Sequence, residues 1–91
     1  KKVYLVNQKE NGGNINISIT ILNGKVTDYE VLSHNETKSY YNIIESDDYI
    51  NKLIKNSDSL ENVDTISGAT ISSSALKKAL VNVLELENNN E

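Results

Sequence analysis

The sequence predicts an α+β fold: a small antiparallel β-sheet with helices packed on one face. Residues 14–21 alternate polar residues with isoleucine, a pattern that buries one face of a strand and is typical of antiparallel sheets. The pair Asn23-Gly24 follows, and this pair is preferred in the type I′ turns of β-hairpins. Near the C-terminus, apolar residues recur at helical spacing over residues 72–86. The chain has 91 residues, so residues 1–91 are expected to form one domain with one core.

Two further strands flank the alternating segment. Residues 3–6 form a short β-type run, which the polar residues 7–13 should end. The return strand runs from Lys25 to about Ser33, and its less regular alternation predicts a bulge or a change of face near Glu30. We therefore expect a meander of three strands at the start of the chain.

The middle of the chain is predicted to be helical, although less clearly. Residues 40–44 are compatible with a strand or with the start of a helix. Ser46, followed by Asp47 and Asp48, has the pattern of a helix N-cap with acidic residues in the first turn. The apolar residues of this second helix would lie on one face: Ile50, Leu53 and Ile54.

Less regular segments flank the C-terminal helix. Residues 60–66 are expected to form a linker with a short strand, and residues 88–90 to fray from the end of the helix. The chain contains no methionine, so we interpret it as a domain excised from a longer protein, without its leader or neighbours.

Composition excludes several classes of function. The nine basic residues are all lysine, they are scattered, and the net charge is −4, which argues against nucleic acid as a partner. No apolar run approaches the roughly 20 residues that a transmembrane helix needs. The absence of cysteine excludes disulfides, thiolate zinc sites and cysteine nucleophiles. No pair of residues with the pattern of a catalytic acid and base is evident.

Residues 64–74 carry the strongest chemical signal. The small residues Ser67, Gly68 and Ala69 form a turn that a ligand can approach closely, and the turn leads into the C-terminal helix. The start of a helix favours an anion such as phosphate. Hydroxyl groups are dense in this segment: Thr65, Ser67, Thr70, Ser72, Ser73 and Ser74. From the residues alone, ordinary helix capping and an anion site both remain open, and the lysine spacing of an ATP-binding P-loop is absent.

The same segment resembles a known motif. Asp64-x-x-Ser67-Gly68-Ala69-Thr70, followed by Ile71-Ser72-Ser73, is similar to the flavinylation motif of the FMN-binding domain family. That family includes the C subunit of the sodium-translocating NADH:quinone reductase, the G subunit of the Rnf complex and bacterial surface flavoproteins. A second region, which runs from Gly24-Lys25-Val26 through Val31-Leu32-Ser33 to His34-Asn35-Glu36-Thr37, is similar to the hairpin of the family that ends in a His-x-Glu-Thr loop. The resemblance covers about residues 12–84.

The resemblance implies a covalent cofactor. The Thr70 hydroxyl would hold FMN as a phosphoester, which a flavin transferase would make from FAD with release of AMP. Asp64 and residues 67–69 would form the sequence that the transferase recognises, and Ile71 and Ser72 would continue it. His34, Glu36 and Thr37 would belong to the loop that approaches the flavin. Lys38-Ser39 stand where the family often has Pro-Gly, which is a departure in this loop.

The resemblance also implies a cellular location and a redox partner. The domain would be an extracytoplasmic electron carrier associated with a membrane or cell surface, with a membrane or surface redox partner. Two alternatives are a non-catalytic interaction module with an empty flavin site, and a reductase with non-covalent FMN.

For single residues, roles without any contact to a cofactor also stay open. His34 could be a solvated loop residue, Glu36 could be a surface carboxylate, and Tyr40 and Tyr41 could fill the core instead of stacking on a flavin.

Overall fold

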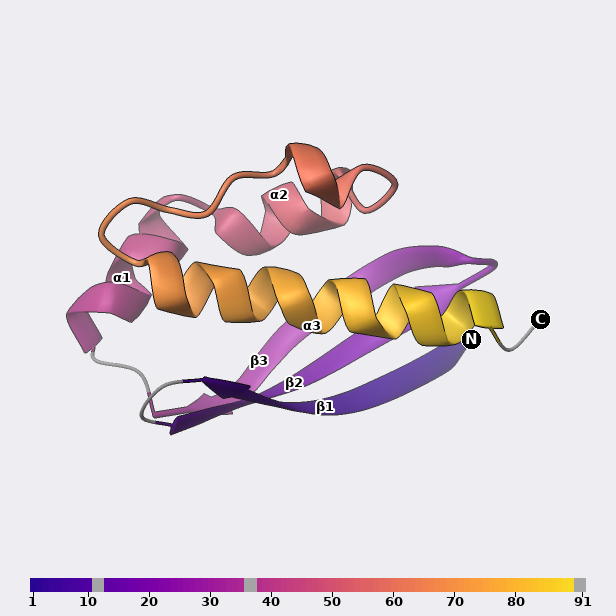
Figure 1. The fold of residues 1–91 in the computed structure, drawn as a ribbon. Helices are drawn as coiled ribbons and strands as arrows, with labels where there is room; N and C mark the ends of the chain where they lie inside the picture. Colours follow the sequence, from indigo (N-terminus) through magenta and orange to yellow (C-terminus); the bar gives the residue numbers. More distant parts are fainter. Residues whose placement is uncertain (11–12, 36–37, 90–91) are drawn as a thin grey trace.

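The computed structural model describes residues 1–10, 13–35 and 38–89. In this part of the chain, an antiparallel sheet in the order β1-β2-β3 packs against helices on one of its faces (Figure 1). This arrangement confirms the predicted α+β fold. The elements are β1 Lys2–Glu10, β2 Gly13–Leu22, β3 Lys25–His34, α1 Lys38–Ser46, α2 Tyr49–Lys55, the short 3-10 helix η1 Leu60–Asn62 and α3 Thr70–Asn89.

The central strand β2 forms the floor of the core. Its isoleucines at positions 15, 17, 19 and 21 are at most 2% exposed, as the alternation predicts. Asn23 and Gly24 both have positive φ, 53° and 79°, which is the conformation of a type I′ turn. The pairing of β2 with β3 shifts register on both sides of the pair Ser18–Glu30, so the irregularity near Glu30 is confirmed.

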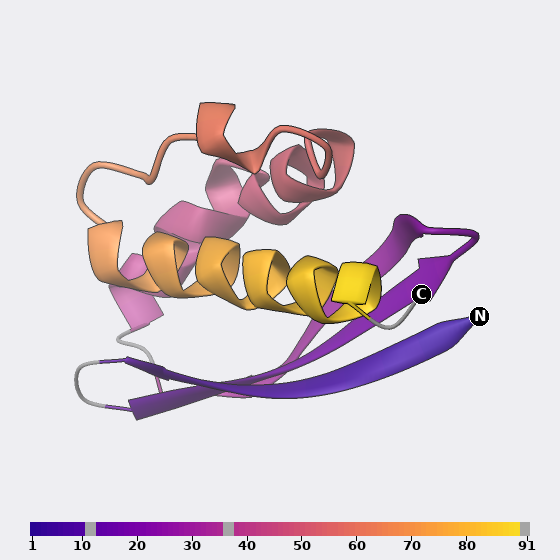
Figure 2. The same cartoon turned by 45° about the vertical axis from the view of Figure 1, so that its right-hand side comes forward.

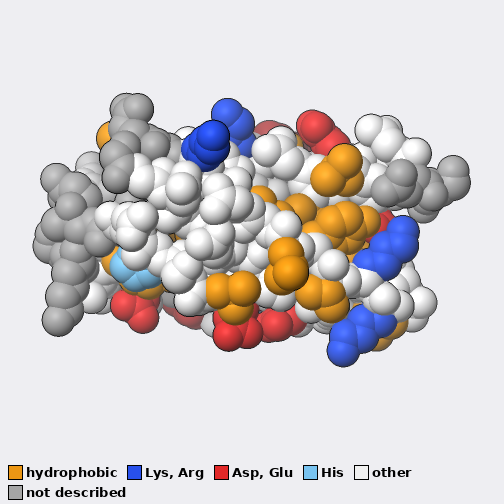
Figure 3. Space-filling model, turned by 90° about the horizontal axis from the view of Figure 1, so that it is seen from below, with side chains coloured by type: hydrophobic (Ala, Val, Ile, Leu, Met, Phe, Trp, Pro, Cys, Tyr) orange, Lys and Arg blue, Asp and Glu red, His pale blue; other side chains and the backbone are white. Residues whose placement is uncertain are grey.

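β1 is longer than predicted. It continues beyond residue 6 through Gln8 and Lys9, which pair with Ile15 and Asn14. Polar side chains do not end a strand at a sheet edge, because only the backbone makes the ladder. Val3 and Leu5 are exposed and alternate along β1 with Tyr4 and Val6, which pair with buried isoleucines of β2, so they lie on the outer face of the sheet. Figure 3 shows hydrophobic side chains on this face among polar and charged groups.

α3 lies across the inner face of the sheet and supplies much of the core. Its buried apolar residues are Ala75, Leu76, Ala79, Leu80 and Val83, as the helical spacing predicts. The helix begins two residues earlier than expected, and it continues to Asn89, where the sequence predicts fraying. None of the helices in the described part of the chain has both the length and the apolar character to cross a bilayer.

The end of α3 and the start of β1 lie side by side, at the end of the molecule opposite to Thr70 (Figures 1 and 2). The Tyr4 hydroxyl donates a hydrogen bond to the Glu87 carboxylate, and the Lys2 Nζ lies 3.5 Å from Glu87 Oε1. The hydrogen bond from Tyr4, and secondarily the charge of Lys2, lower the pKa of Glu87. These contacts join the first strand to the last turn of the last helix.

The predicted N-cap at Ser46 is wrong. Residues 40–44 are helical, and Ser46 is the last residue of α1. α2 instead starts after Asp48, which has a left-handed backbone (φ 57°) and makes no side-chain capping hydrogen bond. The polar residues at 46–48 therefore form the tight connection between two helices, a position that such residues also favour.

The predicted strand within residues 60–66 is also wrong. η1 occupies Leu60–Asn62, and residues 63–66 belong to no helix or strand. They lie on the side of α3 away from the sheet (Figure 1), so no strand is available to pair with them. Lys77 of α3 secures this stretch, because its Nζ donates to the Val63 carbonyl at 2.8 Å. We call residues 63–67 the cover segment.

Candidate functional site

A tight turn connects the cover segment to α3. Gly68 has φ +89°, a left-handed conformation that favours glycine. A Cβ at this position would meet only Ile43 Cδ1, at 3.8 Å, so the backbone conformation and not the available space requires glycine. The amide of Ala69 donates to the Ile66 carbonyl at 3.0 Å and closes the turn. The chain thereby reverses and begins α3 at Thr70.

Ser73 fixes the turn from inside the helix. Its side chain is 0% exposed. Its Oγ accepts a hydrogen bond from the Ile66 amide at 2.9 Å and donates one to the Ala69 carbonyl at 2.8 Å. Ser72 is also buried, whereas four of the hydroxyl residues that the sequence analysis singled out are exposed: Thr65, Ser67, Thr70 and Ser74. The hydroxyl-rich segment therefore divides into residues that build the turn and residues that a ligand can reach.

Thr70 is the exposed first residue of α3. Its Oγ1 donates a weak hydrogen bond to the Ile66 carbonyl, at 3.4 Å. The Ser73 amide bonds to the Ala69 carbonyl at 2.9 Å, so the amides of residues 70–72 precede the hydrogen-bond ladder of the helix. Residues 68–72 line a shallow hollow of about 230 Å³ at this point. Such amides, together with the helix dipole, stabilise an anion.

Two lysines lie beside Thr70. A groove of about 310 Å³ between β1 and α3 is lined by Lys9 and Lys78 together with Thr70 and Ile71. Ile71 is 54% exposed. No basic cluster is evident in the sequence, because these two lysines are separated by most of the chain and are brought together only by the packing of α3 on β1. Lysine side chains that share a groove with Thr70 would favour an anion there.

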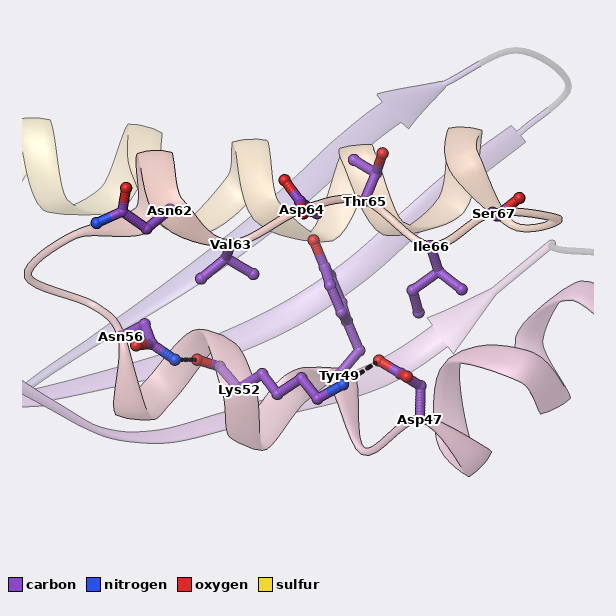
Figure 4. Close-up of a pocket in the computed structure, with 10 residues that line it drawn as sticks. All are labelled: Asp47, Tyr49, Lys52, Asn56, Asn62, Val63, Asp64, Thr65, Ile66 and Ser67. Carbon is purple, nitrogen blue, oxygen red and sulfur yellow. Dashed lines mark hydrogen bonds and ion pairs between the residues drawn. The ribbon is translucent and has the colours of Figure 1, made fainter.

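A larger cavity, of about 450 Å³, lies between α2 and the cover segment (Figure 4). Its mostly polar lining comprises Asp47, Tyr49, Lys52, Asn56, Asn62, Val63, Asp64, Thr65, Ile66 and Ser67. The Lys52 ammonium forms an ion pair with Asp47 at 2.8 Å. The predicted site residues Asp64 and Ser67 therefore border a cavity that the sequence analysis did not anticipate.

Tyr49 is the functional candidate that the sequence analysis missed. Its side chain is 1% exposed, and its hydroxyl has no hydrogen-bond partner in the described part of the chain. Figure 4 shows the ring rising from α2 towards Asp64 in the cover segment. Burial, and then the negative charges of Asp47 and Asp64, raise the pKa of Tyr49, so its hydroxyl keeps its proton and can donate it in a hydrogen bond.

His34, the last residue of β3, stacks on Tyr41 of α1. The ring centroids are 3.9 Å apart and the planes are inclined by 13°. The end of β3 and the start of α3 lie at the same end of the molecule (Figures 1 and 2). The structure thus places His34 at the end that carries Thr70, with one ring face covered by Tyr41. The predictions for Glu36, Thr37 and the Tyr40 side chain lie outside the described residues.

A family model described as the FMN-binding domain matches residues 11–85. No curated protein matches the chain.

Proposed function

The chain belongs to the FMN-binding domain family, and from this premise we propose that it is an electron-transfer domain with FMN attached to Thr70 through a phosphoester. The observation that carries the proposal is the position of the Thr70 hydroxyl, exposed on the first residue of α3. A phosphodiester there would keep one negative charge. The helix amides and the ammonium groups of Lys9 and Lys78 would stabilise that charge.

The attachment requires a separate enzyme. The Thr70 oxygen would attack the phosphorus on the FMN side of FAD, forming the new P–O bond. The bond from that phosphorus to the bridging pyrophosphate oxygen would break, AMP would leave, and the hydroxyl proton would pass to a base. Thr70 Oγ1 donates to the Ile66 carbonyl, which is not a base at neutral pH. We therefore propose that a flavin transferase supplies the base.

The turn is suited to recognition by such a transferase. Ser67, Gly68 and Ile71 are exposed around Thr70, and Asp64 is exposed on the cover segment. Ala69 and Ser72 are buried, and they hold the turn in place instead of offering their side chains. We propose that the transferase binds these exposed residues, and that the rigid turn holds the Thr70 hydroxyl in position for the reaction.

The bound FMN supplies the electron chemistry, and this chain positions it. We propose that the loop of His34, Glu36 and Thr37 flanks the cofactor, since His34 lies at the same end as Thr70. A membrane or surface redox partner would exchange electrons with the domain outside the cytoplasm. A covalent link suits that setting, because a dissociated flavin would be lost by dilution.

Intact mass measured after co-expression with a flavin transferase tests the proposal. We expect the mass to increase by one FMN less one water, and peptide mapping to locate the increase on Thr70. Thr70→Ala should abolish the increase, whereas Thr70→Ser should retain it in part. Ser74→Ala, which removes an exposed hydroxyl one turn later, is the matched control and should leave loading unchanged. An increase that persists in Thr70→Ala would contradict the attachment site.

A further inference from the structure

We propose that the cavity between α2 and the cover segment binds the pyrimidine end of the flavin ring, with the Tyr49 hydroxyl donating to a ring carbonyl and the Asp64 carboxylate accepting the ring N–H. This inference depends on the proposed function, and it assigns a role to two residues of the cavity.

The hydroxyl of Tyr49 is unpaired in the described part of the chain. A buried polar group without a partner costs free energy, and native structures rarely keep one. Tyr49 lines the cavity, and its buried hydroxyl points towards the cover segment without a partner in the described part of the chain (Figure 4). This position favours a ligand or an ordered water as the missing partner.

Tyr49 and Asp64 form a pair of hydrogen-bond donor and acceptor that matches one edge of a flavin. Tyr49 remains protonated, because burial and two nearby carboxylates raise its pKa. It therefore offers a donor, and Asp64 beside it offers an acceptor (Figure 4). The pyrimidine ring of a flavin has a carbonyl, an N–H and a second carbonyl along one edge. A carbonyl next to an N–H complements a hydroxyl next to a carboxylate.

The cavity lies close to the proposed attachment site. Thr70 Oγ1 lies 3.4 Å from the carbonyl oxygen of Ile66, and Ile66 and Ser67 line the cavity. A flavin tethered at Thr70 would therefore start beside one wall of this cavity. The volume of about 450 Å³ falls within the range of about 300–1,000 Å³ that is usual for small-molecule pockets.

Riboflavin, which lacks the phosphate, tests the cavity without the tether. We expect the Thr70→Ala protein to bind riboflavin, with quenching of flavin fluorescence. Adding Tyr49→Phe should weaken this binding about tenfold, which corresponds to about 1.4 kcal/mol. Tyr29→Phe, at a buried tyrosine away from the cavity, is the matched control.

3-Methylriboflavin, which cannot donate from the ring nitrogen, should bind about tenfold more weakly than riboflavin to the parent protein. Equal affinity for the two flavins, or no change with Tyr49→Phe, would overturn the inference.

The FMN-loaded protein gives the deciding measurement if riboflavin alone does not bind. We expect Tyr49→Phe to lower the fluorescence anisotropy of the tethered flavin while the intact mass shows unchanged loading. Unchanged anisotropy with unchanged loading would mean that the cavity holds only water, or that the ring lies against the His34–Tyr41 pair, and the inference would fail while the proposed function stood. Failure of the mass test alone would reject the attachment at Thr70, and the riboflavin result would still report on the cavity.

Discussion

Two buried tyrosines of this domain have opposite surroundings. Tyr29 on β3 is 5% exposed, and its hydroxyl donates to the Leu76 carbonyl of α3 at 2.8 Å. Tyr49 on α2 is 1% exposed, and its hydroxyl has no partner in the described part of the chain. The difference lies in what faces each ring: a regular helix for Tyr29, and a stretch of irregular chain beside a cavity for Tyr49.

The hydroxyl of Tyr29 has a structural role, whereas the hydroxyl of Tyr49 has no structural partner in the described part of the chain. Tyr29 completes the packing of α3 on the sheet, and nothing else is needed to satisfy it. Tyr49 lies below the cover segment, where Lys77 and Ser73 hold the backbone from the other side. Rigid elements thus support an irregular segment that borders a cavity, which is a common arrangement for binding sites.

Alkaline pH should have the largest effect on both tyrosines. Burial raises the pKa of Tyr29 and of Tyr49 above the ordinary value of about 10. A raised pKa in the folded state adds stability that is complete below pH 10 and is lost as the pH rises above it. We expect the midpoint of urea unfolding to fall steeply above pH 10. The fall should be shallower in Tyr29→Phe, and an unchanged slope in that variant would contradict the assignment.

Ser73→Ala should loosen the cover segment. It removes the acceptor for the Ile66 amide and the donor to the Ala69 carbonyl. We expect a loss of about 2 kcal/mol in the free energy of unfolding and a fall of about 10 °C in Tm. Urea and thermal unfolding followed by circular dichroism measure both. The neighbouring Ser74→Ala is the control, and an equal loss in that variant would contradict the role assigned to Ser73.

Tyr29→Phe should destabilise the domain moderately. The variant keeps the ring and loses the hydrogen bond to Leu76, which is worth about 1 kcal/mol. The free energy of unfolding, obtained from urea titration at pH 7, measures the change. An unchanged or increased stability would show that this bond contributes nothing.

Tyr49→Phe should have the smallest effect and the opposite sign. Without bound flavin, removal of an unpaired buried hydroxyl relieves a desolvation cost, so we expect stability to rise by up to about 1 kcal/mol. The same urea titration applies. A loss as large as that of Tyr29→Phe would show that the hydroxyl is already satisfied by water, and the contrast between the two tyrosines would disappear.

Sequence patterns predict the parts of this fold that depend on local periodicity. The isoleucine alternation and Asn23-Gly24 predict β2 and its turn, and the spacing around Leu76 and Leu80 predicts α3. The patterns fail where a segment depends on distant partners. Residues 60–66 have strand-like residues, but α3 separates them from the sheet. Ser46 has the chemistry of a cap, but it ends one helix instead of starting the next.

The candidate site also has some features that the sequence predicts and others that it does not. The exposed Thr70 at the start of a helix follows from the turn Ser67-Gly68-Ala69 and the helical pattern after it. The burial of Ser72 and Ser73 does not follow from these sequence patterns, because it depends on how α3 is rotated about its axis relative to the cover segment. The cavity at Tyr49 could not be predicted, since an unpaired hydroxyl is a property of the assembled core and has no signature in the sequence around it.

The contact of Tyr4 and Lys2 with Glu87 has a practical consequence. It keeps the start of β1 beside the end of α3, at the pole opposite to Thr70 (Figure 1). Immobilising the domain on an electrode or bead through either terminus should therefore orient the Thr70 pole outward, towards a soluble enzyme or redox dye.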